Sequence, residues 1–247
     1  MNTLVCIKRV PETGARISLT ADAQEIDTTF LGFTISPHEE CAVEEAVRIG
    51  GRATVLTLGP RAAEEQLRNA LAMGIESAIL LETDGGDWGP EATAASIAES
   101  VRERGFDLLL FGNEAADTGG YQVGVRVAHA LGLPCVTGVK GLEVGDGGVV
   151  ARREAGGGWE VFELPLPAVV SVKEGINLPR YPSLPGRLKA KKAPIETVAV
   201  SPRPSRLEKV RLVVPQEAPS SVEILGDGAG AAPRVVEVLR EIGVVAS

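Results

Sequence analysis

The sequence predicts an α/β protein in which a mostly parallel β-sheet carries helices on both faces. Short apolar runs alternate with amphipathic helical patterns through the first two-thirds of the chain, and glycine or proline separates them. Such alternation implies right-handed crossovers between parallel strands. The 247 residues, 44% hydrophobic and 23% charged, suit one sizeable globular domain with an appendage.

The predicted strands of this sheet are four apolar runs that read as buried: residues 3–7, 53–58, 77–81 and 107–111. The first helix is expected to begin at Ser36, because Ser36 and Glu39 form a capping-box pair and Pro37 suits the first helical position. The four predicted helices span about residues 37–49, 60–73, 90–105 and 121–131. Each ends at glycine, and a proline follows the last.

The pattern changes after Pro134. Residues 139–144 and 149–154 predict a hairpin with a turn at 145–148, followed by strands at 159–164 and 168–173. We therefore expect an α/β domain at 1–176, a Pro-rich loop at 177–194 and a C-terminal arm at 195–247. The arm has one predicted helix at 233–242 and scattered apolar residues that bury little of their own surface, so we expect it to pack on another protein.

Charge and cysteine usage exclude several classes of protein. A net charge of −8 argues against a nucleic-acid-binding face, and no apolar run is long enough to span a membrane. Cys6, Cys41 and Cys135 are far apart, which argues against a disulfide framework or a thiolate zinc site. These features, and a start that does not read as a secretion signal, predict a cytoplasmic protein.

The clearest candidate site is the segment GNEAADTGGYQVG at 112–124, with four glycines in thirteen residues. It follows a predicted strand and precedes a helix, at the edge where parallel sheets bind ligands. Glycine backbone can approach a phosphate closely and supply N–H donors. The other interpretation is an ordinary strand-to-helix turn.

Catalytic machinery is scarce. The chain lacks GxxxxGK[ST], GxGxxG and SGGxD loops, so a nucleotide would be held rather than hydrolysed. His129 suits a structural role, whereas His38 either lines the site or is structural. No zinc spacing occurs, and Ser171 lacks a nucleophile elbow. We therefore predict a protein that is not itself an enzyme.

The Pro-rich stretch suggests either a docking element or a simple linker. Leu184 lies between Ser183 and Pro185, and basic residues follow it. A rigid segment with an apolar tip binds partners at a low entropic cost.

Segments along the whole chain resemble one family, the β subunit of electron transfer flavoprotein. The matching runs, in order, are VCIKRVPE, SPHEECAVEEAVRI, LTLGP, LRNALAMGIESAIL, GNEAADTGGYQVG and LPLPAVVSVKEGINLPRYPSLPGRLKAKK. The resemblance implies an adenine nucleotide α-hydrolase-like fold and a heterodimer with an α subunit that holds most of one FAD. It also implies electron transfer from dehydrogenases, typically acyl-CoA dehydrogenases of fatty acid oxidation, to a membrane quinone oxidoreductase.

The resemblance further implies a structural AMP and a recognition loop. The AMP site carried over by motif comprises Cys6, Ser36, Pro37, His38, Glu39, Leu58, Gly112, Asn113, Ala115, Asp117, Thr118, Gly119, Gly120, Tyr121, Gln122 and Val123. The recognition loop carries Leu184, flanked by Lys189 and Lys192, and the C-terminal arm would wrap around the α subunit.

Two alternatives stay open. The run DTGGYQVG partly resembles that of flavin-bifurcating relatives, which bind a second FAD in place of AMP. As a separate difference from the family, many members have Asn where this chain has Ser36. A stand-alone nucleotide-binding protein of the universal-stress type shares the architecture. Its Gly-x2-Gly loop is absent here, because Ala115 stands three places after Gly112.

Overall fold

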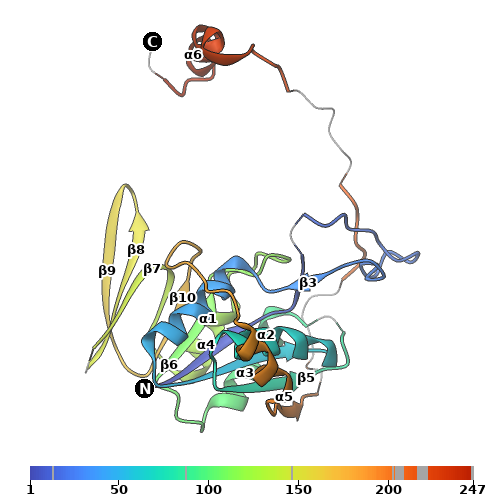
Figure 1. Ribbon diagram of the computed structural model, residues 1–247, viewed down its shortest axis with the longest axis vertical. Helices are drawn as coiled ribbons and strands as arrows, with labels where there is room; N and C mark the ends of the chain where they lie inside the picture. The colour runs from blue at the N-terminus through green and yellow to red at the C-terminus, as the bar shows by residue number, and fades with distance from the viewer. Residues whose placement is uncertain are drawn as a thin grey trace. The chain divides into compact units, whose positions relative to one another are not determined.

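The computed structural model describes residues 1–12, 14–86, 88–145, 147–201, 203, 209–215 and 222–245 (Figure 1). The chain divides into two compact units, Met1–Leu212 and Val213–Ser247. The first unit contains the sheet and the helices around it.

A nine-stranded sheet runs through the described part of the first unit, in the order β11-β5-β4-β1-β6-β10-β7-β8-β9. Strands from β11 to β7 are parallel to their neighbours, while β8 and β9 extend the sheet as an antiparallel hairpin (Figure 1). The bounds are β1 Asn2–Ile7, β4 Arg52–Gly59, β5 Ser77–Glu82, β6 Leu108–Gly112, β7 Cys135–Gly145, β8 Gly148–Ala155, β9 Gly158–Pro165, β10 Ala168–Val172 and β11 Glu196–Ala199. The predicted parallel sheet and hairpin are confirmed; Asp146 of the predicted turn lies outside the described residues.

Helices cover both faces of the sheet, as predicted. Along β1, Val5 and Ile7 pack into the core beneath α1 (Pro37–Ile49) and α2 (Glu64–Met73). Leu4 and Cys6 point the other way, into the core beneath α3 (Pro90–Val101) and α4 (Val123–Leu131). This alternation is the period-2 pattern of a strand that is buried on both faces.

The predicted start of α1 is confirmed in detail. Ser36 is extended, with φ −69° and ψ 153°, and its side chain accepts a hydrogen bond from the backbone N–H of Glu39. The Glu39 carboxylate in turn accepts from the Ser36 N–H at 2.9 Å, which completes the capping box. The other predicted helices differ at their ends: η1 (Arg61–Ala63) precedes α2, α3 ends at Val101, and α4 begins at Val123.

The Pro-rich segment, which the sequence predicted to be a loop, contains a helix. Helix α5 spans Leu184–Lys192; Ser183 caps it by accepting from the Gly186 N–H at 3.1 Å. Pro185 is tolerated because the first turn of a helix needs no N–H donor there. Leu184 is therefore the first residue of a helix rather than the tip of a loop.

The predicted arm also begins inside the sheet. Strand β11 pairs with β5 in parallel, from Glu196 beside Ile79 to Ala199 beside Glu82. A second element absent from the prediction is a small antiparallel pair, β2 (Val10–Pro11) with β3 (Phe33–Thr34). Both depend on pairing between segments that are distant in sequence, which local patterns do not report.

The second unit contains η2 (Gly228–Ala231) and α6 (Ala232–Glu241). The bounds of α6 differ by one residue at each end from those of the predicted helix at 233–242. None of the residues of α6 is buried, although Val235, Leu239 and Ile242 recur at helical spacing. The predicted low self-burial is confirmed for this helix. Residues 202, 204–208, 216–221 and 246–247 of the predicted arm lie outside the described residues.

Candidate functional site

Two predicted site segments meet at the carboxyl edge of the sheet. The loop that follows β6 lies against the start of α1, where the Ser36 hydroxyl donates to the backbone oxygen of Glu114 at 3.0 Å. The His38 Nε2 lies 3.1 Å from a carboxylate oxygen of the same Glu114. The glycine-rich loop is therefore joined to the first turn of α1 by both backbone and side chain.

Gly112 is required where this loop leaves the strand. A Cβ on Gly112 would lie 2.6 Å from Cγ of Glu39 and 3.0 Å from its backbone nitrogen. Glu39 is itself buried. The loop can therefore cross the start of α1 only if residue 112 has no side chain.

The middle of the loop is tied to the end of β1. The Lys8 Nζ lies 2.6 Å from a carboxylate oxygen of Asp117, and the Thr118 N–H donates to the other oxygen at 2.7 Å. Beyond this turn Gly119 and Tyr121 have positive φ, 53° and 55°. The loop is thus fixed at its start and in its middle, while residues 116–122 stay exposed.

The first turn of α4, which ends the loop, has open backbone donors. Gln122 is the N-cap residue but makes no side-chain cap; its amide oxygen instead accepts from the Arg126 guanidinium at 3.0 and 3.1 Å. Among the described residues, no side chain caps this helix start. An uncapped helix start behind two glycines offers N–H groups and a partial positive charge to an anion.

Two of the predicted site residues lie beneath the edge rather than on it. Cys6 is in the core with α3 and α4, and burial, together with the nearby Glu39, raises the pKa of its thiol. Burial raises the pKa of Glu39 to about 8, although the N–H groups of Ser36 and Lys8 oppose this by donating to its carboxylate. Both residues are buried, so they support the edge from below and present no side chain to solvent. Leu58 is partly buried at the end of β4 and packs against the same core as Cys6.

A cavity of about 260 Å³ lies beside the loop and includes residues that sequence reasoning missed. Asn113 and Tyr121 border it, and the missed residues that line it are Thr137, Gly138, Arg153, Glu154 and Lys173. The Asn113 amide oxygen accepts from the Gly138 N–H at 2.8 Å, at an irregularity where Gly138 has φ +71°. Gly138 directly precedes the predicted strand at 139–144, so the sequence pattern did not point to this contact.

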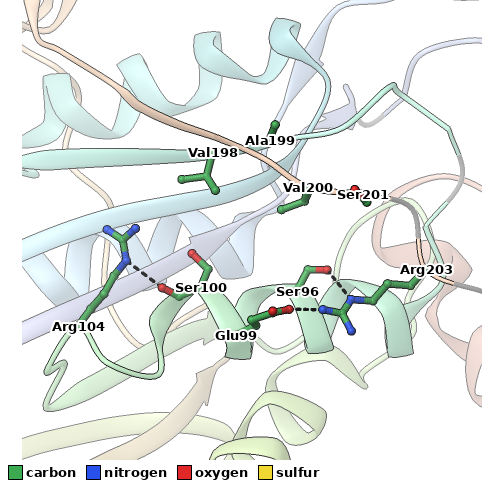
Figure 2. A pocket seen from close by; sticks show the side chains of 9 residues that line it. All are labelled: Ser96, Glu99, Ser100, Arg104, Val198, Ala199, Val200, Ser201 and Arg203. Atoms are coloured by element: carbon green, nitrogen blue, oxygen red, sulfur yellow. Dashed lines mark hydrogen bonds and ion pairs between the residues drawn. The ribbon is translucent and has the colours of Figure 1, made fainter.

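A larger cavity, of about 470 Å³, lies between α3 and the segment 198–203 (Figure 2). Ser96 and Ser100 line it from α3 and Arg104 from the turn after this helix, opposite Val198 and Val200. Its two guanidiniums are matched by carboxylates, because Arg104 pairs with Glu196 and Arg203 with Glu99. None of the predicted site residues lines it.

The predicted partner-binding residues lie together on α5. The side chain of Leu184 is 71% exposed, and Leu188 and Lys192 follow at four-residue spacing on the same helical stripe. Lys189 is also exposed. Opposite this stripe, Ala190 is buried where α5 packs beside α2 (Figure 1). The structure thus presents an apolar stripe with cations at its C-terminal end.

Comparison with known proteins decides the family. The model of the electron transfer flavoprotein domain matches residues 26–203. The electron transfer flavoprotein subunit beta of Bacillus subtilis is 33% identical over 253 residues, covering 97% of this chain and 98% of the relative. This chain belongs to the β-subunit family of electron transfer flavoproteins. The resemblance that the sequence indicated is confirmed.

Other members are similarly close to this flavoprotein subunit. The subunit beta of Syntrophomonas wolfei is 33% identical, covering 97% of this chain and 96% of the relative. That of Mycobacterium leprae is 36% identical, covering 81% and 79%. In the part of the chain that the structure describes, no helix has the length and apolarity to cross a membrane, and no acidic, histidine and cysteine side chains cluster as a metal site.

Proposed function

We propose that this chain is the β half of a heterodimeric electron carrier. Its α partner holds most of one FAD, which supplies the electron-accepting and electron-donating chemistry. The carrier takes electrons from dehydrogenases of the acyl-CoA type and passes them to a quinone oxidoreductase. In this arrangement the β chain contributes a structural AMP site and a docking surface, and no catalytic group of its own.

The open start of α4 carries the AMP assignment. A nucleotide phosphate fits there because backbone N–H groups bind an anion without a basic side chain, which suits a chain of net charge −8. One carboxylate of the loop, that of Asp117, is paired with Lys8 at 2.6 Å, so it repels a phosphate less. The tight contact of Gly112 with Glu39 holds the loop in the shape that leaves these donors open.

We propose that the cavity beside the glycine-rich loop holds only the edge of the shared FAD. That cavity holds about 260 Å³, so it suits a part of a flavin and not the whole molecule. Arg153 and Lys173 border it; Arg153 is paired with Glu160 at 2.6 Å, and Lys173 adds a cation that favours an anionic or electron-rich group. We propose that the α subunit supplies the remaining walls.

The docking role rests on α5. Leu184 and Leu188 are exposed apolar side chains, and Lys189 and Lys192 add positive charge beside them. A partner surface with an apolar pocket and an acidic rim fits this pattern. The partner we propose for it is the dehydrogenase, while the exposed apolar stripe of α6 is proposed to pack on the α subunit.

Counting bound nucleotides tests this function. The chain is purified with its α partner and denatured, and the released nucleotides are identified and quantified. One FAD and one AMP per heterodimer are expected. Two FAD and no AMP would instead assign the chain to the bifurcating type, for which DTGGYQVG is the favouring observation. A chain that holds an adenine nucleotide but binds no α subunit would overturn the carrier function in favour of a stand-alone nucleotide-binding protein.

A further inference from the structure

We propose that helix α1 holds the segment 174–180, which precedes α5, in a fixed conformation. The Glu44–Arg180 pair of this contact positions the docking side chains of Leu184 and Leu188. This inference rests on the proposed docking function. It assigns a role to buried carboxylates of α1 that the nucleotide site does not use.

One face of α1 holds the chain from Glu174 to Arg180. His38 Nδ1 accepts from the Glu174 N–H at 2.8 Å. One helical turn later, the Asn177 side chain donates to the Cys41 oxygen at 2.9 Å and to the Glu45 carboxylate at 2.8 Å. Positions 38, 41 and 45 follow one another at helical spacing, so the segment is bonded to each successive turn.

The last contact in this series is the strongest. Arg180 Nε and Nη2 donate to the two carboxylate oxygens of Glu44 at 2.8 and 2.9 Å, and the Arg180 N–H donates at 3.2 Å. The Glu44 side chain is only 6% exposed, and this pairing lowers the pKa of its carboxyl. A two-point contact between planar groups sets direction as well as distance, so it fixes the backbone at Arg180.

The far end of the docking element is held by α2. Arg68 Nη1 donates to the backbone oxygens of Ala190, Lys191 and Ala193 at 2.9, 3.3 and 3.3 Å, which satisfies the end of α5. Near its start, Gly186 is so close to α2 that a Cβ would lie 2.5 Å from the Ala72 oxygen. The element is therefore held at both ends.

Between these two anchors the apolar side chains face solvent. Tyr181 is 95% exposed and comes directly after Arg180, and Leu184 and Leu188 follow. Exposed apolar groups on a fixed backbone lose less conformational entropy when a partner covers them. Only the Glu44 side of this ion pair is buried, since the Arg180 side chain is 46% exposed. Its directional hold on Arg180 is what the docking role uses.

The test uses the FAD-loaded heterodimer with Arg180→Gln, and Arg180→Lys as the milder variant. The matched control is Glu143→Gln, which removes the exposed Arg152–Glu143 pair, 2.6 Å long, in the β7–β8 hairpin. Amide hydrogen exchange is measured across 177–189. Steady-state reduction by an acyl-CoA dehydrogenase is measured with the heterodimer as the varied substrate.

For Arg180→Gln we expect exchange in 177–183 to rise about tenfold, because the segment opens locally. We expect KM for the heterodimer to rise about fivefold with kcat and FAD content unchanged, since only docking is weakened. Arg180→Lys, which keeps the charge but not the two-point contact, is expected to fall between wild type and Arg180→Gln. Glu143→Gln is expected to match wild type in both measurements.

Unchanged exchange in Arg180→Gln would overturn the proposal. The proposal would also be overturned if Arg180→Gln exchanged faster but kept the wild-type KM, provided that Leu184→Ala raises KM in the same assay. If Leu184→Ala itself leaves KM unchanged, the docking function is wrong, and the exchange measurement alone then decides whether Glu44 holds the segment.

Discussion

Gly112 lies against Glu39 so closely that a Cβ on residue 112 would be 2.6 Å from Cγ of Glu39. This contact joins the glycine-rich loop to the buried capping box of α1. It also connects two features that are 73 positions apart in the sequence, a loop glycine and a helix-capping acid. Each can be tested separately.

Gly112→Ala is expected to destabilise the heterodimer by about 1–3 kcal/mol, because Glu39 is buried and cannot move aside without strain. The unfolding midpoint in denaturant measures this loss. Gly120→Ala is the matched control, since a Cβ there meets nothing within 4 Å. Equal midpoints for the two variants would contradict the close contact.

The buried carboxyl of Glu39 predicts a pH dependence of stability. Its pKa is about 8 in the folded protein against 4.5 for the ordinary group. The folded state therefore binds more protons between these values, and the stabilising effect of the neutral form falls as pH rises from about 4.5 to 8. The slope from this group is at most about 1.4 kcal/mol per pH unit.

Glu39→Gln keeps the oxygen acceptor of the capping box but does not titrate. We expect the free energy of unfolding of this variant to fall less between pH 5 and 8 than that of wild type. Denaturant unfolding of both proteins at each pH measures the difference. Parallel curves would show that Glu39 is already ionised in the folded protein at pH 5.

Leu184→Ala is expected to weaken reduction of the carrier by its dehydrogenase. Truncation of a central apolar anchor costs more than about 1 kcal/mol of binding, which corresponds to a fivefold or greater rise in KM. Stopped-flow or steady-state reduction measures this, with FAD content as a check on integrity. Val144→Ala, an exposed apolar truncation in the β7–β8 hairpin, should leave the rate unchanged.

Val235→Asp is expected to weaken association with the α subunit. It puts a charge on the stripe of α6 that no residue of its own unit buries, and burial of an unpaired carboxylate in an interface is costly. Sedimentation of the mixed subunits gives the dissociation constant. Glu237→Gln, a change at a polar position of the same helix, serves as the control, and an unaltered constant for Val235→Asp would exclude this stripe from the interface.

The sequence by itself determined the parallel α/β sheet, the capping box at Ser36 and the glycine-rich loop. These features depend on local patterns: strand and helix periodicity, cap residues and glycine spacing. The sequence also carried the family resemblance, because the matching runs occur in order along the chain. The loop residues and Leu184 were found in this way.

Only the tertiary structure decided which distant residues meet. Pairing of β11 with β5, the contact of Asn113 with Gly138 and the bond between Glu44 and Arg180 join positions far apart in the chain. It also showed that Cys6 and Glu39 lie beneath the site, since burial depends on what covers a residue and not on its neighbours in sequence. Helix α5 was hidden for a related reason. Pro185 and Gly186 make its first turn poor by helix propensity, and its stability comes from α2, whose Arg68 binds the end of α5 from another part of the fold.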